Sequence, residues 1–426
     1  MSAKSDNTHN IIILGASFAG ISAAHVLLRH VLPPLASASS ITYKVTLISP
    51  SAYFFWKIGC PRSVVFPDLL PLDKQLIPVT DGFKEYESSR FEFLQGAATQ
   101  VDHGSKTVTI QDSSDKVGGE DKKYDLSYDS LIICSGTTQS SPLFVQHGTD
   151  AATRKAFADI HERLPKAKSI VVAGGGAAGT ETAGELGDAY GSSKDITILS
   201  GDDRLLSNLS PSRGQDAERI LKQLGVKTVN NLRVASVTEV DGKTLLKFSD
   251  GTERTVDIYI PAVGDQPNTK FLPKDWLNER GFVKTELQTL RLSVPDVSGV
   301  YVLGSVGSYS AGGVLDIYNA VRPCCESVRV DLVSLLRPQV QVELEKKQKV
   351  RFPCSLIKSS PPLKEHRSPY KQWTGETQII PIGRHHGVGV LFGWGIPQWF
   401  ITMIKGKTFM IEKALPLVHG EDYKKA

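Results

Sequence analysis

The sequence predicts an α/β protein with two repeated strand–turn–helix units and a further α+β module at its C-terminus. Glycine-rich turns about 160 residues apart mark the two units, Gly15-Ala-Ser17-Phe-Ala-Gly20 and Gly174-Gly-Gly176-Ala-Ala-Gly179. Each turn follows an apolar, β-branched run and opens a stretch of small residues, which is typical of a Rossmann-like domain. A chain of 426 residues, 40% of them hydrophobic, is long enough for two or three domains with sizeable cores.

The first unit is expected over residues 10–48 as a strand, a helix and a second strand. The helix should cover residues 18–32 and end at Pro33-Pro34, because proline cannot continue the helical hydrogen-bond ladder. Apolar runs and alternation predict strands at 42–48, 91–94, 107–110 and 131–134, and the polar stretch 111–123 is expected to be a surface loop.

The second unit is expected to start at Ser169, with a helix to about Tyr190 and a strand over Asp195–Leu199. Beyond it, Asp241-Gly242 predicts a tight turn that joins two strand-like runs as a hairpin. The hairpin runs are 234–240 and 243–248, and further apolar strands are predicted at 257–262 and 300–303.

These elements predict three domains. A discontinuous domain is expected over residues 8–145 and 262–340, and a second domain over 146–261. The C-terminal module is expected over 341–426, with a Pro/Ser-rich linker at 353–369 before an aromatic and basic tail.

The first glycine motif is expected to bind the pyrophosphate of a dinucleotide. Gly15 allows the tight turn from strand to helix, and Gly20 lets that helix pack closely on the strand. Ser17 stands where a further glycine is usual, but its side chain is small and its hydroxyl could donate to a phosphate oxygen. The alternative interpretation is an ordinary turn that binds no ligand.

The second motif is complete, with Gly174, Gly176 and Gly179, and Glu181 follows in the predicted helix. Its carboxylate would point back toward a bound cofactor, or it would be an ordinary acid stabilised by the helix dipole. Two such motifs in one chain indicate two nucleotides bound face to face. This is the layout of a flavoprotein that takes hydride from a nicotinamide.

Both motifs lack the acid that usually ends the second strand and holds the adenosine ribose 2′-hydroxyl. The strands end instead at Ser49 and at Ser200-Gly201. At the second site, no carboxylate would repel a 2′-phosphate. Arg204 follows a few residues later and could attract one. The sequence therefore favours NADPH, or use of both NADH and NADPH, unless Arg204 is an ordinary surface arginine.

Three further segments resemble those of flavoprotein oxidoreductases with two dinucleotide-binding domains. Tyr128–Gly136 resembles their strand and Ala-Thr-Gly segment, with Cys134 in place of the alanine. Gly264 opens a stretch that resembles their Gly-x-x-Pro-Asn segment, and Gly304-Ser305 resembles their second flavin signature, which normally ends Gly-Asp. The resemblance covers essentially the whole chain and implies one FAD-binding and one NAD(P)H-binding domain.

Within this superfamily, the segments Phe54–Arg62 and Ile380–Gly389 are similar to the apoptosis-inducing-factor-like group, which includes the ferroptosis suppressor proteins and their fungal relatives. The resemblance implies FAD, oxidation of NADH or NADPH, and electron transfer to a quinone at a membrane surface. By the same resemblance that surface would be the mitochondrial outer membrane or a lipid droplet.

The resemblance also assigns roles to single residues. Glu181 would fix the nicotinamide. Lys57 and Arg62 would place positive charge near the reduced flavin, unless Lys57 is an ordinary solvated lysine. Tyr318 would approach the flavin ring, or pack as an ordinary core aromatic. The residues expected to bind the two cofactors are Gly15, Ser17, Gly20, Ser49, Arg62, Gly136, Gly174, Gly176, Gly179, Glu181, Gly264, Gly304 and Ser305.

Ser17, Ser49 and Ser305 weaken the flavin site relative to the family pattern. Two other functions therefore stay open. One is a dinucleotide-binding or signalling protein without catalysis, and the other is a tailoring flavoenzyme of secondary metabolism.

The five cysteines are scattered, without the paired spacing of a redox disulfide. Cys324 and Cys325 are adjacent on a predicted helix and are expected to be buried, inert thiols. No metal-ligand cluster is predicted, because the side chains of adjacent His385 and His386 would diverge on any regular element.

Gly387–Ile404 carries no charge, but glycines and Pro397 interrupt it, so no membrane-spanning helix is predicted. Trp394 and Trp399, beside Lys405, suit a peripheral membrane contact through residues 387–413, with core packing as the alternative.

A net charge of +4 gives no indication of nucleic-acid binding. Residues 1–10 lack the features of a signal or transit peptide, and Ser2 excludes N-myristoylation, so a cytoplasmic location is expected.

Overall fold

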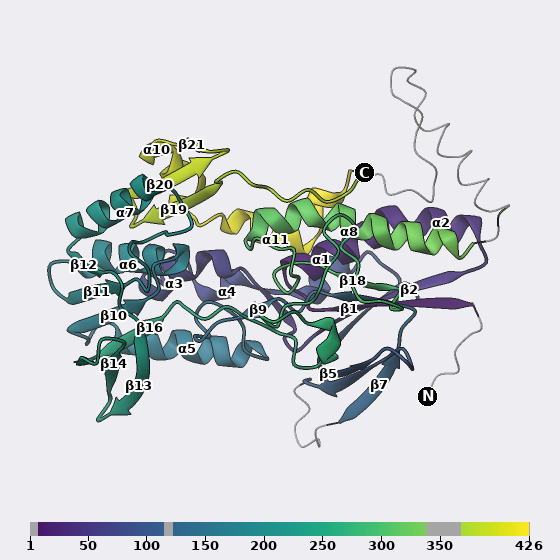
Figure 1. The fold of residues 1–426 in the computed structure, drawn as a ribbon, viewed down its shortest axis with the longest axis horizontal. Helices are drawn as coiled ribbons and strands as arrows, with labels where there is room; N and C mark the ends of the chain where they lie inside the picture. Colours follow the sequence, from purple (N-terminus) through teal and green to yellow (C-terminus); the bar gives the residue numbers. More distant parts are fainter. Residues whose placement is uncertain (1–6, 115–121, 337, 339–367, 426) are drawn as a thin grey trace.

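The computed structural model describes residues 7–114, 122–336, 338 and 368–425. The molecule is elongated and has two α/β lobes, each built on a largely parallel sheet (Figure 1). The first lobe contains the N-terminal glycine motif and the second lobe contains the other motif. The predicted α/β fold class is therefore confirmed.

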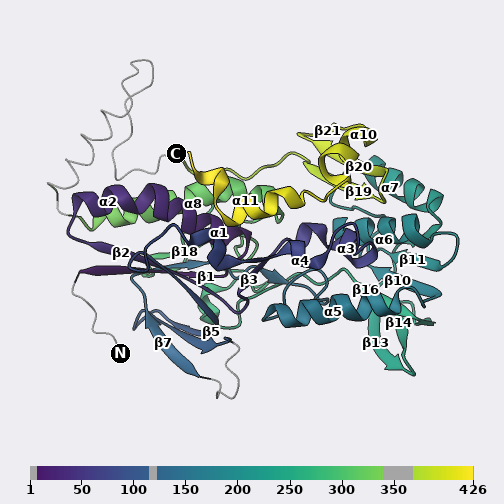
Figure 2. The ribbon, with the colours of Figure 1, turned by 180° about the vertical axis from the view of Figure 1, so that it is seen from behind.

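The first lobe is organised around a seven-stranded sheet in the order β18-β8-β1-β2-β5-β6-β7. Its parallel strands are β1 (Thr8–Leu14), β2 (Thr42–Ser49), β5 (Phe91–Asp102), β8 (Ser130–Ile133) and β18 (Val300–Val302). The strands β6 (Thr107–Asp112) and β7 (Lys123–Ser127) extend it antiparallel. Figures 1 and 2, seen from opposite sides, both place α1 (Phe18–Val26) and α8 (Val314–Ser334) over one face of this sheet.

The predicted end of the first helix is wrong. α1 continues through a π-helical turn, η1 (Leu27–Val31), into α2 (Leu32–Ala38), and Pro33 and Pro34 lie in the first turn of α2. Prolines are tolerated there because N–H groups in a first helical turn need no partner within that helix.

The predicted strand at 91–94 is longer than expected. Its first half pairs with β2 in parallel, and its second half pairs with β6 antiparallel around a bulge between Ala98 and Gln100. The second half contains Gly96-Ala-Ala98-Thr, which lacks apolar alternation. The local pattern therefore gave no sign that the strand continues.

The second lobe has a parallel sheet in the order β12-β11-β10-β16. Its strands are β10 (Ser169–Ala173), β11 (Asp195–Leu199), β12 (Val226–Val229) and β16 (Ile258–Pro261). Helix α5 (Asp150–Arg163) covers one face, and α6 (Ala177–Tyr190) and α7 (Pro211–Gln223) cover the other (Figure 1). The predicted helix end at Tyr190 and the predicted strand at 195–199 are confirmed.

The predicted hairpin is also confirmed. β13 (Val234–Val240) pairs with β14 (Lys243–Phe248) through Asp241-Gly242, where both residues have positive φ. β15 (Glu253–Val256) adds a third strand.

Other short elements lie between the larger ones along the chain. They are β3 (Tyr53–Phe55), η2 (Lys57–Gly59), α3 (Cys60–Val65), α4 (Leu72–Gln75), β4 (Leu76–Pro78), η3 (Val79–Phe83), β9 (Thr137–Thr138), β17 (Gln266–Pro267) and η4 (Lys274–Trp276).

The described C-terminal residues complete the cores of both lobes and do not form one of their own. Ile380 and Val388 join the core of the second lobe, whereas Leu417 and Tyr423 join the core of the first. The elements are β19 (Gln378–Ile382), β20 (His386–Leu391), β21 (Trp394–Gly395), α10 (Gln398–Ile401), η5 (Thr402–Gly406), η6 (Ile411–Lys413), α11 (Ala414–Val418) and η7 (Glu421–Tyr423). Most of the predicted linker at 353–369, and residues 115–121 of the predicted loop, lie outside the described residues.

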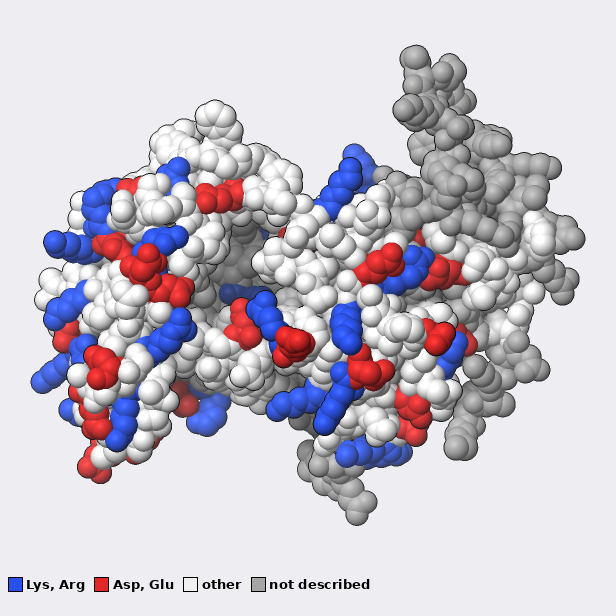
Figure 3. Space-filling view, viewed as in Figure 1, with Lys and Arg blue, Asp and Glu red and all other residues white. Residues whose placement is uncertain are grey.

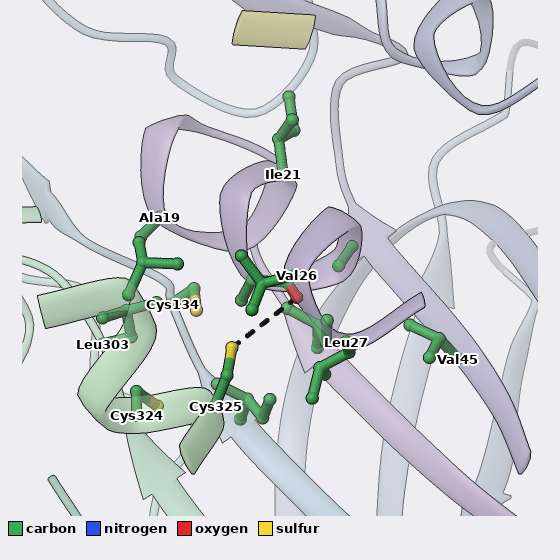
Figure 4. Packing of buried hydrophobic residues seen from close by; sticks show 14 of the residues in the cluster. Ala19, Ile21, Val26, Leu27, Val45, Cys134, Leu303, Cys324 and Cys325 are labelled. Carbon is green, nitrogen blue, oxygen red and sulfur yellow. Dashed lines mark hydrogen bonds between the residues drawn. The ribbon is translucent and has the colours of Figure 1, made fainter. Parts of the chain in front are cut away.

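The adjacent cysteines are buried, as predicted. Cys324 and Cys325 lie on α8 and pack against α1, where the Cys325 thiol is 3.8 Å from the Ala23 carbonyl oxygen (Figure 4). Burial raises the pKa of Cys324 to about 12, so the thiol stays protonated and inert. The four cysteines of the described residues are all free, and Cys354 lies outside them.

Candidate functional site

A cavity of about 510 Å³ opens at the carboxyl edge of the first-lobe sheet, where open parallel sheets bind their ligands. Five short segments from separate elements form most of its wall. They are 14–19, 48–51, 96–98, 134–138 and 303–305, and Phe55, Lys57, Val145–Gly148, Asn268, Phe271 and Ile317 complete it. Figure 3 shows the surface of the molecule hollowed between the two lobes.

The first glycine motif forms one wall of this cavity. Gly15 has φ +115°, and a Cβ there would lie 2.3 Å from the Cys134 carbonyl oxygen. A Cβ on Gly20 would lie 1.8 Å from the Gly15 carbonyl oxygen. Ser17 is exposed at the start of α1 and its side chain caps no helix N–H. Its hydroxyl is therefore available to a ligand, whereas both glycines are required by backbone packing.

The other predicted flavin-side residues lie in the same cavity wall. Ser49 ends β2, and the Ser305 hydroxyl is 3.4 Å from that of Thr137. Gly136 and Gly304 both have positive φ, and the Gly304 N–H donates to the hydroxyl of Tyr309 over 2.8 Å. Tyr309 is buried and holds the turn at Gly304-Ser305 in place.

Lys57 also lines the cavity, where solvent still reaches it. Desolvation by the surrounding protein lowers the pKa of Lys57, and the Asp265 carboxylate opposes this shift. A lysine in such a place can supply either a positive charge or a proton.

Asn268 is a cavity residue to which sequence reasoning gave no role. Its amide donates to the Ser135 carbonyl oxygen over 2.9 Å, and the Ser135 hydroxyl donates back to the Asn268 carbonyl oxygen over 2.7 Å. This pair fixes two segments of the wall against each other. The Gly-x-x-Pro-Asn segment, which ends in Asn268, was the signal that could have predicted this role. Gly264 of the same segment lies outside the cavity wall, and its φ of +91° enables the turn.

The second glycine motif repeats this geometry in the second lobe. A Cβ on Gly174 would lie 2.4 Å from the Ala262 carbonyl oxygen, and one on Gly179 would lie 1.9 Å from the Gly174 carbonyl oxygen. Gly176 is exposed, and a Cβ there would meet nothing within 4 Å. The open position is the one that lets a pyrophosphate approach the backbone.

Glu181 is buried in the first half of α6 and forms an ion pair of 2.5 Å with Lys405. The Lys405 ammonium also donates to the Ile379 carbonyl oxygen over 3.1 Å. Burial raises the pKa of Glu181, and the charge of Lys405 opposes this shift. Sequence reasoning missed Lys405 as a site residue because 224 positions separate it from Glu181.

This geometry agrees with a comparison of the chain with protein families. The model of the pyridine nucleotide-disulphide oxidoreductases matches residues 9–323. The chain belongs to this family.

The oxidoreductase also has relatives along its full length. It is 32% identical to oxidoreductase phnG of Penicillium herquei, over 98% of this chain and 97% of that protein. It is 25% identical to human ferroptosis suppressor protein 1, over 96% of both chains, so the predicted resemblance is confirmed. Its fold matches that of NDH2 from Plasmodium falciparum with a TM-score of 0.65 and 16% sequence identity, covering 98% of this chain and all of that one.

Arg62 is directed away from the cavity of the oxidoreductase. Its guanidinium forms a buried ion pair with Glu185, with Nη2 and Oε1 3.0 Å apart, and donates to the Gly406 carbonyl oxygen over 2.9 Å. It also lies 5.0 Å from the centre of the Phe409 ring. A buried guanidinium needs such partners, and α3 carries it toward α6. The structure therefore gives Arg62 a place between the lobes, unlike the cofactor contact that was predicted.

Tyr318 of the oxidoreductase does not line the cavity, whereas its neighbour Ile317 does. Consecutive side chains on a helix point in different directions, and Tyr318 packs on the hydrophobic core of the first lobe. Burial raises the pKa of Tyr318 to about 12. Its position fits the alternative interpretation as a packing residue.

No helix among the described residues of the oxidoreductase is both long and apolar enough to cross a membrane. Within the same residues, no three His, Cys, Asp or Glu side chains are grouped so that they could hold a metal ion.

Proposed function

We propose that this oxidoreductase binds FAD in the first-lobe cavity, takes hydride from NADH or NADPH bound at the second glycine motif, and passes the electrons to a quinone-like acceptor. One observation carries the proposal. Lys57 lies in the cavity wall and is followed closely by α3. The buried ion pair between Arg62 and Glu185 joins α3 to α6, one turn beyond Glu181. The reactive ends of the two nucleotide sites would therefore meet at one place.

The residues present fit FAD. The cavity has the size of a cofactor pocket, and Ser17 offers a free hydroxyl beside the backbone turn that would hold the pyrophosphate. Ser49 would contact the adenosine ribose, and Ser305 would take the place of the usual aspartate on the flavin side. FAD supplies the two-electron chemistry when it is bound.

The protein would contribute charge and orientation. Lys57 would stabilise the negative charge that reduction adds nearby. The paired contacts between Ser135 and Asn268 would hold the wall rigid, so that the two rings keep their relative position. Glu181, held by Lys405, would fix the nicotinamide end of the second nucleotide.

The absorption spectrum of the purified protein tests this proposal. The protein should be yellow, bleach without oxygen when NADPH or NADH is added, and recover its colour with a water-soluble quinone. A Lys57→Met variant should bind FAD but be reduced more slowly, whereas Lys284→Met, an exchange outside the cavity wall, should behave as wild type.

The outcomes separate the candidate functions. Protein that cannot take up FAD rules out the proposal, and binding of NAD(P)H without reduction would indicate a non-catalytic nucleotide-binding protein. Reduction without reoxidation by quinones would favour a tailoring flavoenzyme that needs a specific organic substrate.

We also propose that the acceptor is reached at a membrane surface, through an aromatic patch on the C-terminal residues. The patch comprises Trp373, Phe392, Trp394, Trp399 and Met403, whose exposed fractions range from 52% to 80%. The surface over α10 and β21 carries few charged side chains (Figure 3). Exposed tryptophans on a surface with few charged side chains suit the boundary between lipid headgroups and acyl chains.

Flotation with liposomes tests the membrane contact. The wild-type protein should float with the vesicles, and a Trp394→Ser/Trp399→Ser double variant should lose several-fold in bound fraction. Leu287→Ser removes an exposed apolar residue from the first lobe and should change nothing. Equal flotation of the double variant, or none by wild type, would reject this contact.

A further inference from the structure

The adenosine end of the second nucleotide site contains two arginines, and Arg204 is engaged within its own loop. Its Nη1 donates to Asp203 over 2.9 Å, and Nη2 donates to the carbonyl oxygens of Ser207 and Leu209 over 3.1 and 3.3 Å. Three contacts within one turn leave this guanidinium poorly placed to bind a ligand. The predicted role of Arg204 toward a 2′-phosphate therefore lacks support from its surroundings.

The Ser200 hydroxyl also has hydrogen-bond partners within the protein. Its hydroxyl donates to the Arg204 carbonyl oxygen over 2.8 Å and accepts the Asp202 N–H over 3.2 Å. The residue is only 2% exposed. It therefore shapes the turn after β11, and a ribose at this edge would meet the residues that follow.

Arg233 reaches this edge from the neighbouring strand. β12 runs parallel to β11, so the segments after both strands meet, and the Leu232 N–H donates to the Ser200 carbonyl oxygen over 3.0 Å. The Arg233 guanidinium lies over Gly201, where a Cβ would come within 2.6 Å of its central carbon. Only a glycine leaves room for this position.

The Arg233 guanidinium is anchored but still available. Its Nη2 donates to the Gly201 carbonyl oxygen over 2.9 Å and to Asp202 over 3.1 Å, while the side chain remains 68% exposed. The acids beside it are occupied, because Asp202 also accepts the Ser207 hydroxyl over 2.5 Å and Asp203 binds Arg204. An exposed guanidinium thus stands where NADH-selective domains present a carboxylate to the ribose.

We propose that Arg233 binds the 2′-phosphate of NADPH and that this contact makes the oxidoreductase prefer NADPH over NADH. The inference rests on the proposed function only in that the second glycine motif binds a nicotinamide nucleotide. A guanidinium offers donors in a planar fork that matches a phosphate, and Asp202 holds the fork in place.

Binding measurements with nucleotide fragments test the inference without turnover. Adenosine 2′,5′-bisphosphate carries the 2′-phosphate but no nicotinamide, and adenosine 3′,5′-bisphosphate is its matched isomer. Wild-type protein should bind the 2′ isomer more tightly in calorimetry. Arg233→Gln should weaken the 2′ isomer and NADPH by about ten-fold and leave the affinity for NADH nearly unchanged.

Two controls make the result specific. Arg219→Gln replaces an exposed arginine that is paired with Asp216 on α7, and it should leave all affinities unchanged. Higher salt should reduce the preference of wild type for the 2′ isomer, because the contact is exposed.

Equal binding of both isomers by wild type, or an unchanged affinity of Arg233→Gln for NADPH, would overturn the inference. If no adenosine nucleotide binds, this inference and the nucleotide part of the proposed function both fail. If Arg233→Gln loses the 2′ preference but the purified protein takes up no FAD, the inference is supported and the proposed function is not.

Discussion

Gly176 and Gly179 belong to one turn, yet different constraints explain them. A Cβ on Gly179 would lie 1.9 Å from a backbone oxygen, whereas one on Gly176 would meet only open space. The protein itself requires Gly179, whereas Gly176 would be required by the nucleotide of the proposed function. Both could be predicted from sequence, because the glycine motif is local.

A pair of alanine substitutions separates these roles. Gly176→Ala should keep its melting temperature within about 2 °C of wild type but weaken NADPH binding by at least about ten-fold, since the added methyl blocks the pyrophosphate. Gly179→Ala should lose about 3 kcal/mol or more of unfolding free energy. Thermal unfolding and calorimetry measure both effects, and equal stability of the two variants would contradict this explanation.

The ion pair between Glu181 and Lys405 predicts a strong coupling. Lys405→Met leaves a buried carboxylate without its partner and should cost about 3–5 kcal/mol of unfolding free energy. The double variant Glu181→Gln/Lys405→Met should recover much of this loss in a double-mutant cycle.

The same pair predicts a dependence on pH. Burial raises the pKa of Glu181, and removal of Lys405 raises it further. The folded state of Lys405→Met then binds a proton at Glu181 more readily than the unfolded chain, so its loss of stability relative to wild type should shrink as the pH falls toward the carboxyl range. Urea unfolding of wild type and of Lys405→Met at two pH values checks this. The same difference in unfolding free energy at both pH values would refute it.

At the scale of elements, helix α6 carries acids at three positions along one face. Glu181, Glu185 and Asp188 are spaced by four and three residues, so they lie along one side of the helix. Each pairs with a cation from another segment, and these cations are Lys405, Arg62 and Arg384. The acidic spacing was visible in the sequence, but the partners were not, because they lie far away in the chain.

Helix α1 is tied to the C-terminal tail by a buried histidine. The His25 Nε2–H donates to the Val418 carbonyl oxygen over 2.8 Å, and Nδ1 accepts the Tyr86 hydroxyl over 2.9 Å. The ring stacks on Phe83 with centres 4.3 Å apart. Burial lowers the pKa of His25 to about 4, which favours the neutral imidazole.

This histidine predicts a loss of stability in mild acid. Between pH 6.5 and 4, His25 becomes protonated in the unfolded chain but stays largely neutral in the folded protein. The unfolding free energy should therefore fall by about 2–3 kcal/mol over this range. His25→Asn should be less stable at pH 7 and change less between pH 7 and 4.5. His385→Asn, on an exposed turn, should follow wild type in urea titrations, and an equal pH slope for His25→Asn would exclude this cause.

For the whole molecule, the C-terminal residues join the two lobes. β19 and β20 complete the core of the second lobe, while Leu417, Val418 and Tyr423 complete that of the first. Sequence patterns predicted the α/β class, both glycine motifs and most strand positions, because these depend on neighbours. They treated the tail as a separate module, since nothing local tells which distant surface an apolar residue will cover.

Deletion of residues 414–426 should therefore affect the lobes unequally. The first lobe loses the four buried side chains of Ala414, Leu417, Val418 and Tyr423, so its backbone amides should exchange hydrogen faster. The amides of β10 and β11 should stay protected. Deletion of residues 424–426 removes only surface contacts from the described part of the tail and serves as the control. Uniform loss of protection in both lobes would show that they unfold as one unit.

The contact between His25 and Val418 spans 393 positions of the chain. During synthesis, α1 leaves the ribosome with all nine of its residues destined for burial but without the segment that covers them. The second lobe can assemble its sheet while translation continues, because residues 169–261 supply all four strands. The first lobe must wait until Val418 has been synthesised, and until then this apolar helix lacks part of its cover.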